Sequence, residues 1–495
     1  MKKRVLAIAM SLAMTLSLLP VSALAAEEIE TPIQKEVTST NQTEEEVATV
    51  TDYVAQVGNT QYTTLEAAFG AAKDGDTITL INDAILSTTI YVHCDGDIIF
   101  DMNGKTVSLG ATETDGGTII FSGNSNVTIS GNGTVDFNDS YLTGNSSGRM
   151  FEVEQNATLT IENGTFEAGL TCVLADHNAT VNIMGGYYSA YASYSNKYWI
   201  LNRQDGTQTR YFVYGGTFKN YDPSNSDTEN PTDNFCADGY VSVQDGDQYT
   251  VMPMEEAAVA QIGNEYYLTL AEAISDAQDG ATIVLLRNTT ENIDISANQD
   301  ITLDLNGKTL TETDVMIVDG NLTIMDSTAP AAPQVSSDYE TVNYDAGAIV
   351  NIRNESPWGN CHTIVVQNGG QVTLLGGKIK STGNCGIYVN GNLNPEGSDN
   401  TADIPSKLTV AGGYIEALEF GAAVAGRGAQ LDISDGVIVA ENNAAVAGNG
   451  TNSQNAYYGG TKINISGGTI ISHITSDGYI ACGIYHPQRG ELNIS

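Results

Sequence analysis

The segment Thr180-VNIMGGYY-Ser189 combines an alternating strand, a corner of two glycines and the beginning of a second strand. Alternate side chains of an extended strand lie on one face, so Val181 and Ile183 share a side. Glycine permits the positive φ that a sharp backbone bend requires. The segment therefore predicts two short strands that meet at a tight corner.

The same pattern recurs along the chain with Gly-Gly, Asn-Gly or Asp-Gly at the corner. Its other copies are Thr158-LTIENGTF-Glu167, Arg210-YFVYGGTF-Lys219, Gln371-VTLLGGKI-Lys380, Lys407-LTVAGGYI-Glu416, Gln430-LDISDGVI-Val439 and Lys462-INISGGTI-Ile471. Successive corners lie 22, 30, 36, 23 and 32 residues apart, leaving out the jump between the two halves of the chain. One such unit cannot bury its apolar face alone, so neighbouring units must stack. We therefore predict an all-β solenoid, specifically a right-handed parallel β-helix.

A longer duplication divides the chain into two modules. Ala55-QVG-Asn59 recurs 205 residues later as Ala260-QIG-Asn264, and Asp101-MNGK-Thr106 recurs 203 residues later as Asp304-LNGK-Thr309. Many further positions coincide in the same register, which indicates two copies of one unit. We place β-helix module 1 at residues 53–252 and β-helix module 2 at residues 257–495. The last residues, Glu491-LNI-Ser495, begin another coil, so module 2 is expected to be truncated at its C-terminal end.

Each module is expected to open with a short capping helix. Thr64-LEAAFGAA-Lys73 and Thr269-LAEAISDAQ-Asp279 carry apolar residues at helical spacing. Thr63 with Glu66, and Thr269 with Glu272, predict capping boxes. The end coil of a solenoid exposes strand edges, so a helix there shields them. The segment 236–251 predicts two short strands around an Asp-Gly-Asp turn that close module 1.

The N-terminal residues predict export from a bacterial cell. A basic start at residues 1–4, an apolar run at 5–19 and Ala23-Leu-Ala25 together match a signal peptide over residues 1–25. Residues 26–52 are acidic and lack a hydrophobic pattern, which predicts a disordered linker. Six cysteines at irregular spacing favour buried thiols, although Cys361 and Cys385 are candidates for a disulfide. We therefore expect a secreted or cell-surface protein.

The charge excludes some classes of partner. The chain has 60 acidic and 20 basic residues, a formal net charge of −40. Such a surface opposes binding to nucleic acid and to anionic membranes, both of which attract Lys and Arg. Like charge also opposes self-association, so a monomer is expected. No cofactor or metal site is predicted, because the Asp-Gly-Asp turns do not continue into an EF-hand loop; calcium would bind only weakly and non-specifically.

The repeated motifs resemble those of a known group of proteins. The opening A-Q-(V/I)-G-N, the turn D-(M/L)-N-G-K-T, the G-G corners and the closing Ala237-DG-Tyr240 are together similar to modular right-handed parallel β-helix surface proteins of Gram-positive gut bacteria, which have the pectin-lyase-like fold. The resemblance covers about residues 55–495. It implies a cell-surface location and leaves activity open, since that fold carries polysaccharide lyases, hydrolases and non-catalytic proteins.

One aromatic cluster is the candidate ligand-binding site. Its members are Tyr187, Tyr188, Tyr191, Tyr194, Tyr198 and Trp199. Exposed aromatic rings give flat platforms on which sugar rings can stack. In the alternative interpretation, Tyr187 and Tyr188 begin a strand and the other rings pack a loop onto the coil.

No catalytic residue is predicted. Asp176-His177 resembles the Asp-His pair of pectate lyases only superficially, because no Arg-x-Pro-x-x-Arg follows it. The leading hypothesis is an exported, non-catalytic rod for adhesion, glycan binding or display. The alternative is an extracellular polysaccharide lyase or glycoside hydrolase, which requires acidic and basic side chains to converge on one face of one module.

Overall fold

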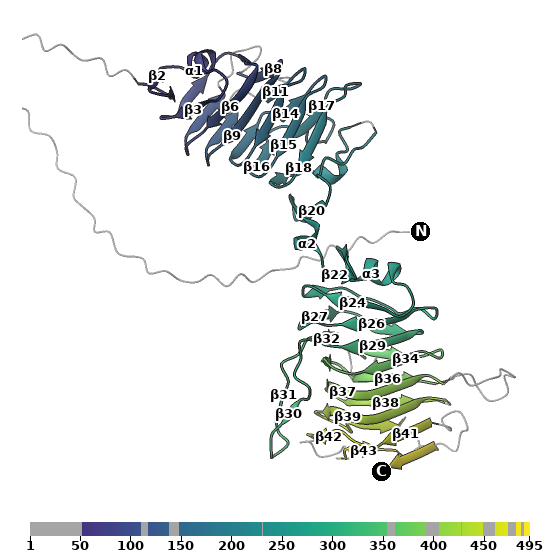
Figure 1. The fold of residues 1–495 in the computed structure, drawn as a ribbon. Helices are drawn as coiled ribbons and strands as arrows, with labels where there is room; N and C mark the ends of the chain where they lie inside the picture. The colour runs from purple at the N-terminus through teal and green to yellow at the C-terminus, as the bar shows by residue number, and fades with distance from the viewer. Residues whose placement is uncertain are drawn as a thin grey trace, which may run out of the picture. The chain divides into compact units, whose positions relative to one another are not determined.

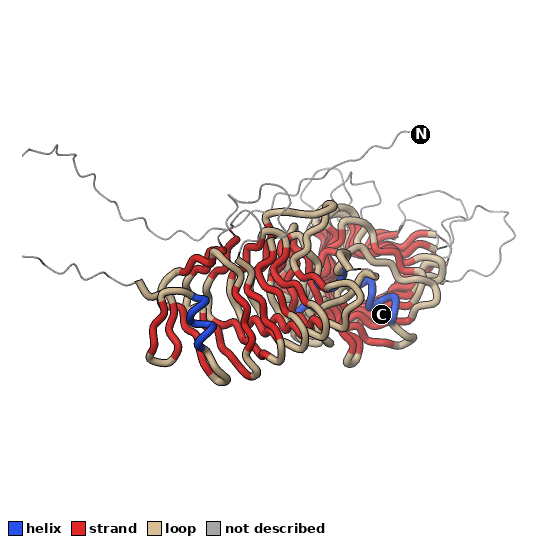
Figure 2. Tube along the Cα trace, turned by 90° about the horizontal axis from the view of Figure 1, so that it is seen from above, coloured by secondary structure: helices blue, strands red, loops and turns tan. Residues whose placement is uncertain are grey.

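The computed structural model describes residues 52–109, 117–137, 148–229, 231–353, 362–391, 405–426, 428–448, 461–473, 482–486 and 490–495. The predicted signal peptide (1–25), the predicted linker (26–52) except Asp52, and Cys361 lie outside the described residues. Within the described ranges the chain is all-β with parallel sheets, and its helices are short (Figure 2). This confirms the all-β part of the predicted fold class.

Module 1 distributes its successive strands over three sheets in turn (Figure 1). The first sheet holds β1 (Ala55–Val57), β2 (Thr60–Tyr62), β3 (Asp76–Leu80), β6 (Gly96–Asp101), β9 (Ser125–Ser130), β12 (Thr158–Ile161), β15 (Thr180–Ile183) and β18 (Arg210–Val213). The second holds β4 (Ala84–Leu86), β7 (Thr106–Leu109), β10 (Thr134–Phe137), β13 (Thr165–Ala168), β16 (Tyr187–Ala190), β19 (Thr217–Lys219), β20 (Tyr240–Asp245) and β21 (Gln248–Pro253). The third holds β5 (Ile90–His93), β8 (Ile119–Ser122), β11 (Arg149–Val153), β14 (Thr171–Ala175) and β17 (Leu201–Arg203). From β3 to β19 every third strand pairs in parallel with its predecessor, an arrangement compatible with a β-solenoid.

Module 2 repeats this three-strand cycle. One sheet holds β22 (Ala260–Ile262), β23 (Glu265–Tyr267), β24 (Ala281–Leu285), β25 (Thr289–Thr290), β26 (Asp300–Asp304), β27 (Thr309–Glu312), β29 (Asn321–Met325), β32 (Ala348–Asn351), β34 (Gln371–Leu374), β35 (Lys378–Ser381), β37 (Lys407–Ala417), β39 (Gln430–Ala440), β41 (Thr461–Ile465), β42 (Thr469–Ser472) and β44 (Gly490–Ile494). A second holds β28 (Met316–Val318), β33 (Ile364–Val366), β36 (Cys385–Asn390), β38 (Phe420–Ala425), β40 (Val446–Gly448) and β43 (Ile484–Tyr485). The long strands β37 and β39 each run through a glycine corner and so join two faces into one sheet. A separate hairpin, β30 (Gln334–Val335) and β31 (Val342–Asn343), interrupts the cycle.

The two glycines of a corner have different structural roles. Gly186 has φ of +103°, which side chains rarely tolerate. At Gly185 a Cβ atom would lie 2.7 Å from the carbonyl oxygen of Glu162 in the preceding coil. The first glycine therefore permits close stacking of coils, and the second permits the bend.

The Asp-x-Asn-Gly turn has the same geometry in both modules, as its recurrence predicts. Asp101 Oδ1 accepts a hydrogen bond from the backbone N–H of Asn103 at 2.9 Å, and Asp304 does the same for Asn306 at 3.0 Å. Both asparagines have φ of 47°. Their Nδ2 groups donate to the carbonyls of Leu80 and Leu285, one coil back. The prediction of a structural turn is confirmed.

Short helices and a hairpin stand where end elements were predicted. The helices are α1 (Leu65–Ala71), α2 (Met254–Ala257) and α3 (Leu270–Asp276). The capping box of Thr269 and Glu272 is present, but the N-cap of α1 is Thr64 and not the predicted Thr63. Thr64 is the residue whose side chain reaches the backbone N–H of Ala67. At the other end of module 1, β20 and β21 are the two predicted strands around the Asp-Gly-Asp turn; they pair antiparallel with each other, and β21 also pairs antiparallel with β19.

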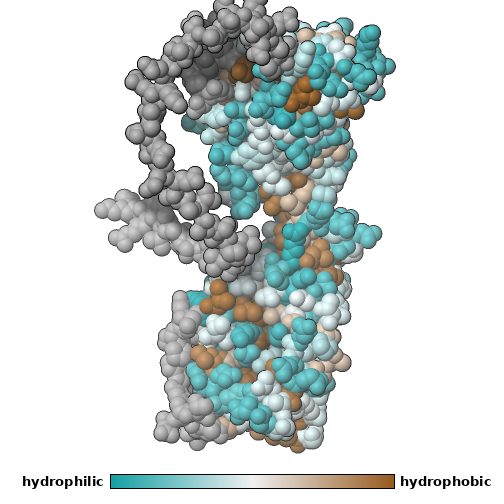
Figure 3. Space-filling view, turned by 90° about the vertical axis from the view of Figure 1, so that its left-hand side faces the viewer, coloured by the Kyte–Doolittle hydropathy of each residue, from teal (hydrophilic) through white to brown (hydrophobic). Residues whose placement is uncertain are grey.

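The buried apolar residues form two main clusters along the chain. One contains residues from Ala55 to Val251 and the other residues from Ala260 to Ile465. In the first cluster the Tyr188 ring stacks between Phe166, at 5.1 Å, and Phe218, at 4.8 Å. Equivalent positions of successive coils thus fill the interior with like side chains. On the outside, hydrophilic side chains cover much of the face in Figure 3 and hydrophobic ones form scattered patches.

Glu312 is an exception to this apolar interior. It is fully buried, and no hydrogen bond of ordinary geometry satisfies its two carboxyl oxygens among the described residues. Burial raises the pKa of Glu312 to about 9; a contact with the backbone N–H of Ile293 opposes this rise, and the charges of Asp294 and Asp314 add to it. Leu109 occupies the equivalent position of module 1, after the same Asp-x-Asn-Gly-Lys-Thr turn.

We expect Glu312→Leu to stabilise the protein by about 1–3 kcal/mol at neutral pH, because it removes a buried polar group without partners. A raised pKa means that the folded wild type holds a proton that the unfolded chain loses. Wild-type stability should therefore fall as pH rises from about 4.5 to about 9, and that component should disappear in Glu312→Leu and Glu312→Gln. Urea unfolding at several pH values measures both effects. Leu109→Glu, the reverse exchange, should be destabilising; equal pH profiles of wild type and Glu312→Gln would contradict the assignment.

Candidate functional site

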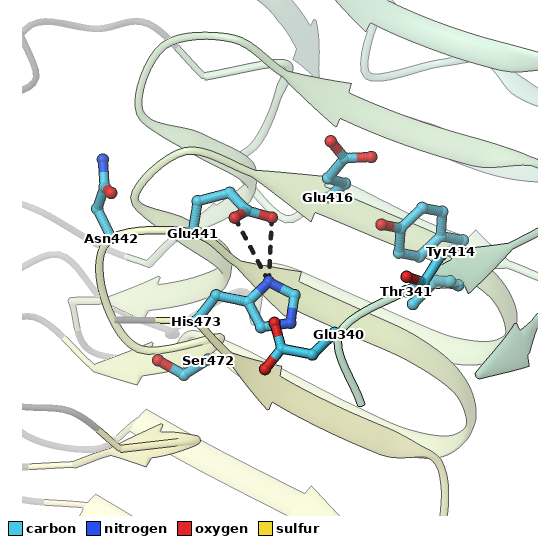
Figure 4. A pocket seen from close by; sticks show the side chains of 9 residues that line it. Glu340, Thr341, Tyr414, Glu416, Glu441, Asn442, Ser472 and His473 are labelled. Atoms are coloured by element: carbon cyan, nitrogen blue, oxygen red, sulfur yellow. Dashed lines mark hydrogen bonds and ion pairs between the residues drawn. The ribbon is translucent and has the colours of Figure 1, made fainter. Parts of the chain in front are cut away.

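A polar cleft in module 2 lies beneath the segment that links β29 to β32. We call residues 327–346, which include the β30–β31 hairpin, the arm. The cleft has a volume of about 590 Å³ and is lined by Glu340, Thr341, Val342, Tyr414, Glu416, Glu441, Asn442, Ser472 and His473 (Figure 4). A smaller pocket of about 290 Å³ shares Val342, Tyr414 and Glu416 with it. The cleft therefore combines residues of the arm with residues of β37, β42 and the end of β39.

An apolar cluster attaches the arm to the sheet. Tyr344 of the arm packs with four residues of the strands, namely Tyr414, Val437, Val439 and Ile471. Ala329, Val335, Val342 and Ala346 of the arm pack against this cluster. Because Val437 and Val439 alternate with the inward-facing Ile438, they lie on the outer face of the sheet. The arm thus covers outer positions that would otherwise expose apolar surface to water.

Asp326 ties both ends of the arm together at its base. Its Oδ1 accepts hydrogen bonds from the N–H and hydroxyl groups of Thr328, at 2.9 and 2.7 Å, and its Oδ2 accepts one from the N–H of Gly347. Burial opposes ionisation of this carboxyl, but the hydrogen bonds from Thr328, Gly347 and Gly307 lower the pKa of Asp326 overall. The base of the arm is therefore anchored by an ionised carboxylate.

Carboxylates from two neighbouring strands face the cleft. Glu416 lies on β37 and forms an ion pair with Lys380 at 2.9 Å. Glu441 follows β39, one strand spacing of about 4.8 Å across the sheet from β37 and two residues further along it. Burial, and then the charges of Glu416 and Glu441, raise the pKa of Tyr414 above its ordinary value, so its hydroxyl stays protonated. The cleft thus presents hydrogen-bond acceptors, one phenol donor and an excess of negative charge.

His473 links the arm to the sheet. Its Nε2 lies 2.9 Å from the carbonyl oxygen of Tyr339 at the tip of the arm, and its Nδ1 lies 3.3 Å from Oε1 of Glu441. The hydrogen bond to Tyr339 and the carboxylate of Glu441 raise the pKa of His473 above 6.5, against the lowering by burial. Glu340 of the arm, drawn near the ring in Figure 4, adds to this effect.

The structure divides the predicted aromatic cluster of module 1 into different roles. Tyr187 and Tyr188 begin β16, as the alternative interpretation expected. Tyr188 is fully buried in the core and its hydroxyl donates to the carbonyl of Gly185. The prediction of Tyr188 as a ligand-binding residue is therefore wrong, because neighbouring residues of a strand face opposite sides and Tyr188 faces inward. Tyr198 is half-buried and packs against the same core.

Two rings of the cluster remain well exposed. Tyr191, 46% exposed, lies just after β16, and its hydroxyl donates to Asp136 Oδ1 at 2.9 Å and approaches Glu167 Oε2 at 3.4 Å. Its ring therefore lies across the outer face of the second sheet toward β13 and β10. Tyr187 shares this outer face, because it is an even number of residues from Tyr191.

The loop that follows holds the other exposed ring. Tyr194 is 64% exposed and lies 6.2 Å from the half-buried ring of Trp199. Trp199 Nε1 donates to the carbonyl of Tyr194, and the Tyr194–Lys197 bridge closes the loop. Tyr191 and Tyr194 are thus presented to solvent by residues that hold them in place.

The remaining sequence candidates form no further site among the residues described. The exposed His177, at φ of 54°, lies 3.0 Å from the half-buried carboxylate of Asp176. Within the described ranges, no three His, Cys, Asp or Glu side chains are grouped so as to hold a metal ion. No helix in those ranges is both long and apolar enough to span a bilayer. The cysteines described are free, with Cys172 and Cys385 buried.

We expect Tyr188→Ala to destabilise the protein by about 3–5 kcal/mol, as loss of a buried aromatic ring does. Tyr188→Phe keeps both ring stacks and loses one hydrogen bond, at a cost of about 1 kcal/mol. The exposed Tyr194→Ala serves as the control and should change stability by less than about 0.5 kcal/mol. Urea unfolding checks all three; an unchanged stability of Tyr188→Ala would contradict the core assignment.

Comparison with known proteins adds no relative to this description. No family model, curated protein or solved structure matches the chain.

Proposed function

We propose that the chain is an exported, cell-surface protein that binds glycans without cleaving them, on a frame of right-handed parallel β-helices. The observation that carries the proposal is the pair of exposed rings in module 1, Tyr191 and Tyr194. A sugar ring presents an apolar face that can stack on an aromatic ring, and hydroxyl groups that need hydrogen-bond partners. The outer face around Tyr191 offers both kinds of contact.

The regular strand cycle supports the proposed frame. Each strand from β3 to β16 pairs in parallel with the third strand after it, as expected if three strands make one coil of a β-helix. Right-handed connection is the rule where parallel strands of one sheet are joined by a crossover. A frame of this kind presents a long, flat outer face, suited to an extended polymer. The motifs that resemble Gram-positive surface proteins, and the predicted signal peptide, support a function outside the cell.

The anchoring of Tyr191 favours a binding role over simple exposure. An exposed tyrosine normally samples several rotamers, and ordering it on binding costs about 0.5–1.5 kcal/mol. Here Asp136 and Glu167, on two successive coils, hold the hydroxyl in advance. Their remaining acceptor positions can receive sugar hydroxyls. The ring is therefore pre-organised for stacking.

We expect Tyr191→Ala with Tyr194→Ala to weaken binding of the full chain to its glycan about tenfold or more, a loss of about 1.4 kcal/mol or more. Tyr91→Ala is the matched control, because Tyr91 is 72% exposed on β5 of another sheet of the same module. A glycan array, with and without calcium, identifies the ligand. Equal loss in the double variant and in Tyr91→Ala would contradict the proposed site, as would the absence of any glycan binding.

The cleft of module 2 supports a second candidate function, cleavage of an extracellular polysaccharide. Glycosidases use two carboxyl groups about 5–10 Å apart, and Glu416 and Glu441 come from adjacent strands of one sheet. Lys380 and Tyr414 provide a neighbouring cation and a phenol. This is the convergence of charged groups on one face that the enzymatic alternative requires.

Release of reducing or unsaturated ends from glycans bound in the array tests this second function. We expect no release from the wild type under the non-catalytic proposal. Release that is lost in Glu441→Gln, but retained in Glu162→Gln at an exposed position after β12 of module 1, would replace that proposal with the enzymatic one.

A further inference from the structure

We propose that the arm over the cleft of module 2 is a pH-dependent lid, held closed at its tip by a protonated His473 and released when His473 loses a proton. The inference rests on the contacts of the arm and is independent of the glycan site in module 1. The described contacts that hold the arm include the Asp326 base, the apolar cluster in the middle, a hydrogen bond from Lys378 Nζ to the carbonyl of Tyr344 and the contact of His473 at the tip. Among these groups, His473 is the one whose ordinary titration range lies near neutral pH.

Both ring nitrogens of His473 face hydrogen-bond acceptors. Nε2 faces the carbonyl oxygen of Tyr339, and Nδ1 faces the carboxylate of Glu441. A neutral imidazole has one N–H donor and one nitrogen lone pair, so either tautomer points a lone pair at one of these acceptors. Only the imidazolium donates to both. The contact between the arm and the sheet is therefore complete only in the protonated state.

The charged groups around the ring act in the same direction. The arm contributes Glu340, the residue after β39 contributes Glu441, and β37 contributes Glu416 and Tyr414 to the same cleft (Figure 4). Lys380, the cation nearest these groups on β35, is paired with Glu416. Burial and the neighbouring carboxylates raise the pKa of Tyr414, so its hydroxyl stays protonated. Histidine is the side chain whose ordinary titration range lies between about pH 5 and 8, so His473 is the group of the cleft that we expect to respond to pH there.

The sign of the effect follows from the direction of the shift. The carbonyl of Tyr339 and the charge of Glu340, both on the arm, raise the pKa of His473, so this pKa is higher with the arm closed than with its tip free. Stabilisation of the closed state by this contact is then fully present below the pKa of the open state and is lost as pH rises through the pKa of the closed state. The lid is expected to be closed in mildly acidic surroundings and open at its tip in alkaline ones.

The local geometry permits opening at the tip alone. The tip is a turn in which the N–H of Ser336 donates to the carbonyl of Thr341, and Tyr339 has φ of 63°. These contacts lie within the arm and do not tie its tip to the sheet. The carboxylate of Asp326 keeps the base in place while the tip separates from His473. Opening would widen access to Glu416 and Glu441 and expose part of the apolar cluster.

Hydrogen–deuterium exchange on the full chain, corrected for the intrinsic effect of pH, tests the proposal. We expect peptides that cover residues 336–343 to exchange several-fold faster at about pH 8 than at about pH 5, while peptides of β37 and β39 stay equally protected. His473→Gln, which does not titrate, should abolish this pH step. His177→Gln is the matched control, because His177 also pairs with a carboxylate but lies in module 1.

Two outcomes would overturn the lid. One is equal exchange of residues 336–343 at both pH values in the wild type, and the other is a pH step that persists in His473→Gln. If His473→Gln also loses protection in β37 and β39, Glu441→Gln replaces it. That variant should shift the step to lower pH, since the carboxylate that favours the imidazolium is gone, and an unchanged step would contradict the proposal.

Discussion

In-register stacking of equivalent residues in neighbouring parallel strands is the constraint on which the rest of this structure depends. Paired strands lie about 4.8 Å apart, so an inward side chain always contacts its counterpart in the next coil. Phe166, Tyr188 and Phe218 show the result, three rings stacked in one column. The constraint also explains the paired corner glycines, since a Cβ at the first of them would meet the backbone of the coil before. Sites can form only where outer positions, or insertions between strands, are free of this repetition.

Much of the strand arrangement could be predicted, because in-register stacking requires a short residue pattern that repeats along the sequence. Alternating residues predicted the strands, glycine pairs predicted the corners, and the recurrence of Asp-x-Asn-Gly predicted a structural turn. The N-cap of α1 was predicted at Thr63 and lies at Thr64, so the sequence located the start of this helix to within one residue. Thr63 and Thr64 are both good capping residues, and only the backbone geometry selects between them.

The candidate sites were harder to predict for physical reasons. Tyr187 and Tyr188 are identical in type, and only the register separates an outer ring from a core ring. The aligned corners do hold that information, since Thr165-Phe166 and Thr217-Phe218 place an aromatic residue at the second position. The arm has no counterpart in the repeat, and the sequence contains one indirect indication that something covers the sheet there. Val437 and Val439 are apolar at outer positions, which indicates a cover, but nothing local identifies the cover as residues 327–346.

The three-strand cycle allows a functional loop to be added without weakening the strand pairing that stabilises the fold. An insertion between two strands, such as the arm, leaves the pairing of the strands on either side unchanged, because each strand takes its position from its neighbours in the sheet. An unfavourable loop therefore disturbs the structure only locally and leaves the strand pairing elsewhere unchanged. Adding or removing one entire coil would shift every later surface feature by the same fixed step and keep its chemistry. Binding features can therefore be moved, repeated or exchanged between regularly spaced positions along the stacked strands during evolution.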